Sequence, residues 1–520
     1  MSNRASRGRT LVAALLAPLM VAACLAATAS PASSAPGHHP PGQGSRAEAR
    51  AALADAQSAL AGHGAGPSRD ATMALLDLVR LRGSLTGADR AAAARALARP
   101  TTTQSTCTAD NCYHWNIAGA DAVPTADTNT NGVPDYVDTV IATVDGVRDT
   151  YVGAGYRAPE ADGALGGNAK TDIYLADVGS KSLYGYCTTD KTFPAQPTTF
   201  DAWAYCVLDN DYAPDQFPTN TPLENLQVTA AHEYFHAVQF AYDAWEDSWF
   251  MEATATWAED ELYDDVNDNL QYLVESPLSK PGRPLDTFTN GAGPQYGDWI
   301  FFRFLTEHLP TAAGGMPTLV RDMWRRADGA SGGPDDYSMQ AVAHVLAARG
   351  ANLTGAFTSF AAANRMPTRS YAEGAANHYP VAAPGGAFKL STSKKDSGWK
   401  VATVAHLASA TARFVPGTGL AASSRRLKVT VDLPPRSTAT TAVVTVAKRS
   451  GAPQVVRVPL TSTGAGTTKV AFGSSVVKYV EVTLVNAGAR YSCWTGGAYS
   501  CRGTSKDDGR KLYVRAQVTT

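Results

Sequence analysis

The chain has 520 residues, of which 44% are hydrophobic and 18% are charged, so it can hold two or three domains with a sizeable buried core. Its formal net charge is -2, which excludes a generally basic protein. The basic residues form no recognisable nucleic-acid-binding motif and are not interleaved with aromatic residues, so we expect no nucleic-acid partner.

Charge is distributed unevenly along the chain. Residues 101–300 contain 31 acidic and 7 basic residues, whereas residues 381–520 contain 20 basic and 5 acidic residues. The acidic stretch is consistent with cation sites, and the basic stretch with binding of anionic cell-envelope polymers. The alternative for both stretches is ordinary solvated surface.

Residues 1–35 are typical of a secretory signal peptide. Arg4, Arg7 and Arg9 precede the apolar run LVAALLAPLMVAACLAA, and small-residue cleavage sites such as ATA and SSA follow. The run is shorter than the roughly 20 residues of a membrane span, and Pro18 interrupts it, so we expect no transmembrane span. VAAC ending at Cys24 resembles a lipobox, which leaves lipoprotein anchoring open. We expect a secreted, extracellular protein.

Six further cysteines support export. They fall into three couples that are close in sequence, which suggests three disulfides in an oxidising compartment, although six cysteines allow 15 pairings. None has the C-x-x-C spacing of a redox or zinc-thiolate site. The six are Cys107, Cys112, Cys187, Cys206, Cys493 and Cys501.

Residues 36–100 form a separate stretch of the chain. A Pro/Gly/Ser-rich tract, expected to be flexible, is followed by Ala- and Leu-rich sequence with helical spacing, which ends at ARPTTT. This pattern predicts either a helical pro-segment or an ordinary N-terminal helical subdomain.

Residues 127–138, DTNTNGVPDYVD, match a twelve-residue calcium loop. Oxygen ligands stand at alternate positions, and Gly132 occupies the position of the sharp turn. An aspartate replaces the usual glutamate at position 12. A plain Asn/Gly turn is the alternative to structural Ca²⁺. The expected ligands are Asp127, Asn129, Asn131, the Val133 carbonyl, Asp135 and Asp138.

The motif HEYFH follows TPLE, a predicted capping box with Pro222 at the first helical position. In a helix that continues from there, His232, Glu233 and His236 share an arc of about 100°. Two imidazoles one turn apart can bind Zn²⁺, and the glutamate between them can act on water. The alternative is a helix that only happens to carry two histidines.

A third zinc ligand is expected from WFMEATATWAED. Glu252 comes sixteen residues after His236, and a short acidic turn would let a second helix pack back on the first. Glu252 and Glu259 are seven residues apart and share a face of that helix. Glu252 can therefore bind the metal while Glu259 accepts an N–H from a ligand histidine.

The pattern HEYFH…WFMEATATWAE resembles the gluzincin metallopeptidases. The resemblance implies zinc ligands His232, His236 and Glu252, the general base Glu233, and Glu259 behind a histidine. The gap to the third ligand is slightly shorter than in aminopeptidase-like members, and Ala253 replaces the usual glycine. The calcium-loop-like stretch, HEYFHAVQ and a β-rich tail together resemble a family of secreted bacterial metalloproteases of this type.

Two further elements are expected near this helix. Tyr296, ahead of an apolar helical run, is a candidate donor to the oxyanion of the reaction, or else a structural tyrosine. KTDIYLADVG, residues 170–179, predicts a strand. By analogy with gluzincin-like folds, it would be an edge strand that pairs with extended peptide.

After residue 388 the sequence changes to short, alternating, β-branched stretches that predict an all-β sandwich. The expected fold class is α+β: a gluzincin-like catalytic domain over residues 101–388, followed by a β-sandwich over residues 389–520.

The expected function is a secreted, zinc-dependent endopeptidase, made as a zymogen, that acts on peptide or protein substrates with Zn²⁺ and structural Ca²⁺. The alternatives are a non-catalytic, calcium-stabilised cell-surface adhesion protein and a hydrolase of non-peptide amides in envelope polymers. The intact Glu233 argues against adhesion, since a binding protein needs no base there.

Overall fold

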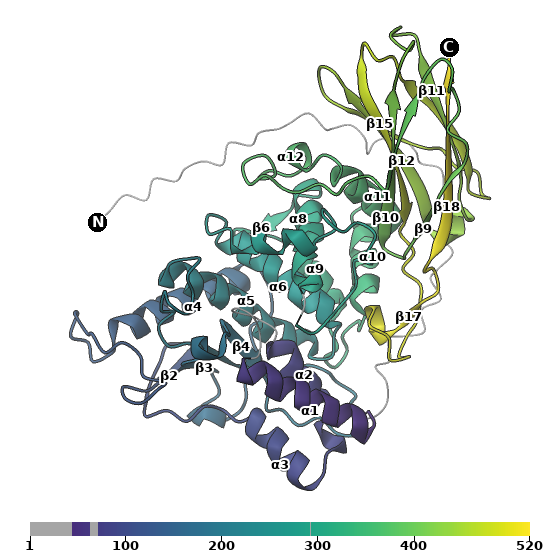
Figure 1. Cartoon of the computed structure of the whole chain (residues 1–520). Helices are drawn as coiled ribbons and strands as arrows, with labels where there is room; N and C mark the ends of the chain where they lie inside the picture. Colours follow the sequence, from purple (N-terminus) through teal and green to yellow (C-terminus); the bar gives the residue numbers. More distant parts are fainter. Residues whose placement is uncertain (1–43, 63–70, 292) are drawn as a thin grey trace. The chain divides into compact units, whose positions relative to one another are not determined.

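The computed structural model describes residues 44–62, 71–291 and 293–520 (Figure 1). The described residues belong to one compact unit. The expected signal peptide, Cys24 and the tract up to residue 43 lie outside the described residues.

Three helices form the N-terminal part of this unit: α1 (Arg46–Ala61), α2 (Ala71–Leu81) and α3 (Gly87–Ala96). In α1, Ser45 and Glu48 form a capping box. Every residue of α2 except Asp77 is buried. The helical character expected for this stretch is confirmed, whereas its role as a pro-segment stays a prediction.

A five-stranded sheet follows in the order β1-β2-β3-β5-β4. Its interior strands β2, β3 and β5 are parallel, and all their residues are buried, as expected for strands covered on both faces. The strands are β1 (Gln104–Cys107), β2 (Asn111–Trp115), β3 (Thr171–Ala176), β4 (Gly185–Thr188) and β5 (Tyr205–Asp209).

The strand expected at residues 170–179 is β3, but its expected place at the sheet edge is wrong. β3 pairs with β2 on one side and β5 on the other. The edge next to the helices of the candidate site is β4, which runs antiparallel to β5. Sequence alternation predicts a strand, whereas strand order depends on tertiary pairing.

The two helices of the HEYFH region are α5 (Pro222–Asp243) and α6 (Ser248–Leu262). α5 begins as predicted, with Thr221 and Glu224 in a capping box and Pro222 in the first turn. All its residues from Val228 to Asp243 are buried, so α5 is enclosed on every side rather than along one stripe.

Other helices surround α5 and α6. α4 packs against α5, and α8 packs against α6. These helices are α4 (Asp135–Gly153), α7 (Pro294–Gly297), α8 (Trp299–His308), α9 (Leu319–Arg326), α10 (Ser338–Ala348), α11 (Leu353–Ala363) and α12 (Pro367–Ser370), with the 3₁₀-helices η1 (Arg82–Ser84), η2 (Leu165–Gly167), η3 (Gly179–Lys181) and η4 (Asp268–Glu275) and the small hairpin β6 (Ala312–Ala313) and β7 (Met316–Pro317).

The C-terminal strands form two sheets, β13-β12-β15-β10-β8 and β14-β11-β18-β9, which share one hydrophobic core. This is the β-sandwich expected from the alternating sequence. Its strands are β8 (Gly386–Leu390), β9 (Lys400–Val404), β10 (Ala408–Pro416), β11 (Arg426–Asp432), β12 (Thr440–Lys448), β13 (Gln454–Arg457), β14 (Ala465–Ala471), β15 (Val477–Asn486) and β18 (Arg510–Thr519); the short pair β16 (Tyr491–Ser492) and β17 (Thr504–Ser505) and the 3₁₀-helices η5 (Arg436–Thr438) and η6 (Ser500–Arg502) also belong to this region.

Two buried carboxylates link the helical region to the C-terminal region. Asp286 accepts hydrogen bonds from the Ser500 amide at 3.0 Å and the Tyr491 hydroxyl at 2.7 Å, and contacts His406 Nε2 at 3.0 Å. Asp247, just before α6, accepts a hydrogen bond from the Cys501 amide at 2.7 Å. These carboxylates are satisfied by donors more than 100 residues away in sequence.

The chain is thus a mixed α/β protein with several sheets and helices, which agrees with the α+β class. The gluzincin-like assignment and the boundaries at residues 100 and 388 stay predictions. Among the residues that the structure describes, no helix combines the length and apolar character needed to cross a membrane.

Candidate metal centre

Helices α5 and α6 bring together three side chains of metal-ligating types. His232 and His236 come from α5, and Glu252 comes from α6. His232 Nε2 lies 3.1 Å from His236 Nε2 and 3.1 Å from Glu252 Oε2, and His236 Nε2 lies 3.7 Å from the same oxygen. All three side chains are fully buried. The three residues expected as zinc ligands therefore meet at one point.

Each histidine is held by a partner on its other ring nitrogen. His232 Nδ1 lies 2.6 Å from Glu259 Oε1, as expected from the seven-residue spacing on α6. His236 Nδ1 lies 2.7 Å from Gln239 Oε1. The Gln239 amide nitrogen donates to the Met251 carbonyl at 2.9 Å, so its oxygen faces the ring. Both Nδ1 atoms therefore carry the proton when the rings are neutral.

This arrangement leaves three lone-pair donors facing one another. Two bare Nε2 atoms and a carboxylate in a fully buried space repel unless a cation stands between them. Glu252 Oε1 has no hydrogen-bond partner among the described residues. Two imidazoles and one carboxylate, with a place left for water, are the donor set of catalytic zinc sites, so these residues fit Zn²⁺.

The pKa shifts of His232 and Glu252 also indicate that the site favours positive charge. Burial lowers the pKa of His232, but hydrogen bonds and attraction from Glu252 and Glu259 outweigh it and raise that pKa to about 9. Burial raises the pKa of Glu252, but the charge of His236 and hydrogen bonding by His232 outweigh it and lower that pKa to about 2. A proton and a metal ion compete for this position.

Glu233 lies beside the donors, as the expected general base should. It is fully buried, and burial raises the pKa of its carboxyl. Its Oε2 accepts a hydrogen bond from the Thr72 hydroxyl of α2 at 2.9 Å, while Oε1 has no partner among the described residues. Glu233 is therefore in contact with the N-terminal helices.

Tyr296 also lies close to the centre. It belongs to α7, is only 4% exposed, and its ring centroid is 6.2 Å from that of His232. Tyr272 stacks on its other side at 4.9 Å. The structure thus places Tyr296, the expected oxyanion donor, next to a histidine expected to bind zinc, and its part in the reaction stays a prediction.

The expected calcium loop lies at the exposed start of α4. Asp127 accepts hydrogen bonds from the amides of Asn131 and Gly132, and Gly132 has a positive φ of 86°, as the turn position requires. The side-chain nitrogens of Asn129 and Asn131 donate to Asp138 at 2.8 and 3.0 Å.

The loop therefore gathers its first, third, fifth and twelfth residues around one point. The amide nitrogens of Asn129 and Asn131, rather than the oxygens, face Asp138. Both amides would have to turn for their oxygens to bind a cation. Asp135 accepts a hydrogen bond from the Thr128 amide, and the Val133 amide donates to Asn131 Oδ1. Calcium binding stays a prediction.

The six cysteines form the three sequence-local disulfides. They are Cys107–Cys112, Cys187–Cys206 and Cys493–Cys501. The second pair joins β4 to β5 directly beside α5, where Cys187 Sγ contacts the Glu233 carbonyl oxygen. This disulfide therefore braces the sheet edge next to the candidate base.

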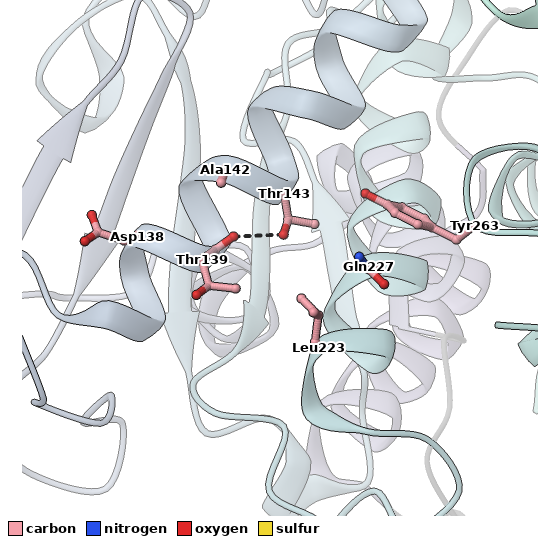
Figure 2. A pocket seen from close by; sticks show the side chains of 7 residues that line it. All are labelled: Asp138, Thr139, Ala142, Thr143, Leu223, Gln227 and Tyr263. Atoms are coloured by element: carbon pink, nitrogen blue, oxygen red, sulfur yellow. Dashed lines mark hydrogen bonds between the residues drawn. The ribbon is translucent and has the colours of Figure 1, made fainter. Parts of the chain in front are cut away.

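A surface hollow of about 470 Å³ lies elsewhere, between α4 and α5 (Figure 2). On one side Thr143 donates a hydrogen bond to the Thr139 carbonyl, and Asp138 links the hollow to the calcium loop. The hollow does not include the zinc donors. Its other lining residues are Ala142, Leu223, Gln227 and Tyr263.

Sequence reasoning missed two residues at the centre. Gln239 follows His236 by three residues on the same helix, so helical spacing could have identified it. Thr72 stands 161 residues before Glu233, and no local pattern marks it. Long-range contacts of this kind require the fold.

Comparison with known proteins adds little. No protein-family model matches the chain, and no curated protein matches it. A solved structure of a GH115 4-O-methyl-α-glucuronidase with specificity for decorated arabinogalactans is similar at a TM-score of 0.15 and 9% identity, over 71% of this chain. The match spans about half of that enzyme, 54%. A likeness this weak carries no argument about fold or function.

Proposed function

We propose that the protein is a secreted zinc-dependent endopeptidase. The observation that supports this most is the meeting of His232 Nε2, His236 Nε2 and Glu252 Oε2 in a fully buried space, with both histidines held through Nδ1. Glu233 beside them supports a hydrolase in particular, because a site that only binds metal needs no carboxylate there.

The residues of the chain have separate parts in the proposed reaction. Bound Zn²⁺ would supply a Lewis acid that polarises the scissile carbonyl and lowers the pKa of water. Glu233 would take a proton from the attacking water and pass it to the leaving amine. Its buried position raises its pKa, which suits a group that must both accept and release a proton. Tyr296 would donate to the developing oxyanion.

Calcium at residues 127–138 is a separate part of the proposal. Three aspartates and two asparagines within one loop supply the hard oxygen ligands that Ca²⁺ prefers. Bound Ca²⁺ would stabilise the loop that leads into α4 and the first turn of that helix. We expect added Ca²⁺ to raise the melting temperature of the wild-type protein and to have no effect on Asp127→Ala, as measured by differential scanning calorimetry.

Export is supported by the disulfides, since such bonds persist in oxidising compartments. The basic residues 381–520 remain candidates for contact with anionic cell-envelope polymers. The second candidate function, hydrolysis of a non-peptide amide in envelope material, would use the same metal centre and differ only in substrate.

The test uses the mature protein as the producing cell secretes it. We expect one zinc per chain by elemental analysis, and casein cleavage that falls by at least about 100-fold in Glu233→Gln with zinc retained. Asp149→Asn, an amide substitution at an exposed carboxylate, is the control and should leave both unchanged. Bound zinc without cleavage of casein or any peptide library would favour adhesion. Equal cleavage by wild type and Glu233→Gln would remove Glu233 as the base.

A further inference from the structure

The N-terminal helices close the candidate active centre. The Thr72 hydroxyl donates to Glu233 Oε2 at 2.9 Å and accepts the Cys187 amide hydrogen at 3.0 Å. Thr72 is fully buried, as are Glu233 and the zinc donors. One side chain of α2 is thus hydrogen-bonded both to the candidate base and to the backbone of the neighbouring strand.

The strand that Thr72 contacts is the edge strand β4. In an antiparallel edge strand, alternate amides point away from the sheet and can pair with an added strand. Cys187 lies opposite Cys206 on β5, and its outward amide is taken by Thr72. α2 packs against β4 along this edge (Figure 1). An extended peptide cannot pair with β4 while α2 is there.

Arginines hold this segment in place. Arg80, which is 4% exposed, donates to the carbonyls of Ala244 and Glu246 between α5 and α6, at 3.0 and 2.9 Å. Arg82, just after α2, donates to the Asp190 carbonyl at 2.9 Å. Charge-assisted hydrogen bonds of this kind are stronger than neutral ones.

Arg99 anchors the far end of the segment, after α3. It pairs with Asp162 at 2.7 Å and Asp190 at 2.8 Å, and also with Asp172. The segment thus places arginines on a region of the chain that is strongly acidic. The chain that follows is exposed at Thr101 and Thr103, and proteolytic cuts concentrate in exposed loops.

We propose that helices α1, α2 and α3, with the described residues 44–62 and 71–99, are an intramolecular inhibitor in which the Thr72 hydroxyl is hydrogen-bonded to Glu233, and that a cut between α3 and β1 opens the centre. This inference rests on the proposed zinc peptidase function and gives the expected pro-segment a mechanism. The alternative, an ordinary N-terminal subdomain, would leave the centre equally accessible before and after the cut.

The test uses the full chain with a site-specific protease sequence inserted at residues 101–103. Two quantities are measured before and after cutting, at nanomolar protein: the rate at which a chromogenic chelator removes zinc, and the rate of cleavage of a quenched fluorescent peptide. We expect both rates to rise at least 10-fold. The same insertion in the exposed turn at residues 450–452 of the sandwich is the control, and its cleavage should change neither rate.

The outcomes separate this inference from the proposed function. Equal rates before and after the cut contradict the proposed inhibition, whether or not the N-terminal helices dissociate. Cleavage of the peptide in that case would still support the peptidase. Faster zinc removal, with no cleavage of the quenched peptide, of casein or of a peptide library, supports closure of the centre by the helices and refutes the peptidase. A chain that binds no zinc in either state overturns both.

Thr72 itself is tested without cutting the chain. Thr72→Val keeps the shape of the side chain and removes both hydrogen bonds, so we expect zinc removal to become several-fold faster. Thr72→Ser keeps the hydroxyl and should match the wild type. Equal rates in all three proteins, with matching circular dichroism, would show that the hydroxyl contributes nothing to the closure.

Discussion

Two clusters of side chains of metal-ligating types share helix α6, and the difference that matters here is whether the chain itself supplies a cation to them. Glu252 meets His232 and His236, whereas Asp260 meets Asp264 and Glu373. In the second cluster the guanidinium of Arg303 already stands among the carboxylates, 3.1 Å from Asp260, 3.3 Å from Asp264 and 2.9 Å from Glu373. The first cluster has no such cation from the described part of the chain.

The comparison shows that closeness of donors does not make a metal site. The carboxylates around Arg303 are neutralised by a cation that the fold supplies. Glu259 orients His232 and Gln239 orients His236, so that the Nε2 atoms of both rings face Glu252 Oε2. Only an added cation or proton relieves the repulsion between these three donors. Because Arg303 already supplies positive charge to the carboxylate cluster, we expect metal only at the histidine cluster.

The largest expected difference between the clusters is in zinc content. Glu252→Gln removes a ligand, so we expect zinc affinity to fall by more than about 100-fold, beyond the effect of losing a supporting partner. Glu373→Gln should keep one zinc per chain. Elemental analysis after dialysis measures both. Zinc lost from the Glu373→Gln protein instead would place the metal in the second cluster.

Removing the positive charge of Arg303 should lower the stability of the protein and leave its zinc content unchanged. Arg303→Met removes the cation that buried Asp260 faces and leaves it only the hydrogen bond from Asn269, so we expect the free energy of unfolding to fall by about 3–5 kcal/mol in urea titrations. Zinc content should not change. Arg148→Met, which breaks ion pairs with exposed Asp110 and Asp149, is the control and should cost at most about 1 kcal/mol. An Arg303→Met protein as stable as the wild type would contradict this view of the cluster.

Gln239 offers a finer test of the histidine cluster. Gln239→Leu removes the acceptor of His236 Nδ1, so we expect zinc affinity to fall by about 10–100-fold, measured by competition with a chelator. Gln239→Glu keeps an oxygen acceptor there and should recover most of the affinity. Equal affinities for the Leu and Glu variants would mean that the hydrogen bond does not orient the ring.

The smallest expected effect is a pH dependence of stability from the second cluster. Burial raises the pKa of Asp260 to about 7, and burial together with Asp264 raises the pKa of Glu373 to about 8. The folded state then keeps protons that the unfolded state has lost, so the free energy of unfolding falls as pH rises from about 5 to about 8.

Glu373→Gln removes one of these two groups. We expect the loss of free energy of unfolding between about pH 5 and pH 8 to become smaller in this variant, by less than about 1 kcal/mol, because Glu373 is partly exposed. Urea titrations across this pH range measure it. An unchanged slope would mean that Glu373 does not hold its proton in the folded state.

The sequence predicts those parts of the molecule that depend on local spacing. Helical periodicity places His232 and His236 on one face of α5 and Glu252 and Glu259 on one face of α6, and TPLE marks the start of α5. Cysteines close in sequence form the disulfides because a short loop costs little entropy to close.

The remaining features depend on contacts between distant segments. The order of strands that makes β4 the edge, the insertion of Thr72 at Glu233 and the position of Arg303 among three carboxylates all follow from tertiary packing. No local sequence pattern predicts these three features, because each of them depends on a contact between segments far apart in the chain.

The hydrogen bonds of Asp247 and Asp286 have a consequence for how this protein can be divided. A chain that ended at residue 388 would leave both carboxylates without the amide donors of Cys501 and Ser500. The same truncation would remove Leu407, Val485 and Tyr491 from the hydrophobic core that they share with the helices, and losing large buried side chains costs several kcal/mol, a large part of the stability of an ordinary domain. We therefore expect the helical region to fold stably only when synthesis has reached the last strands, so that premature termination yields no stable fragment.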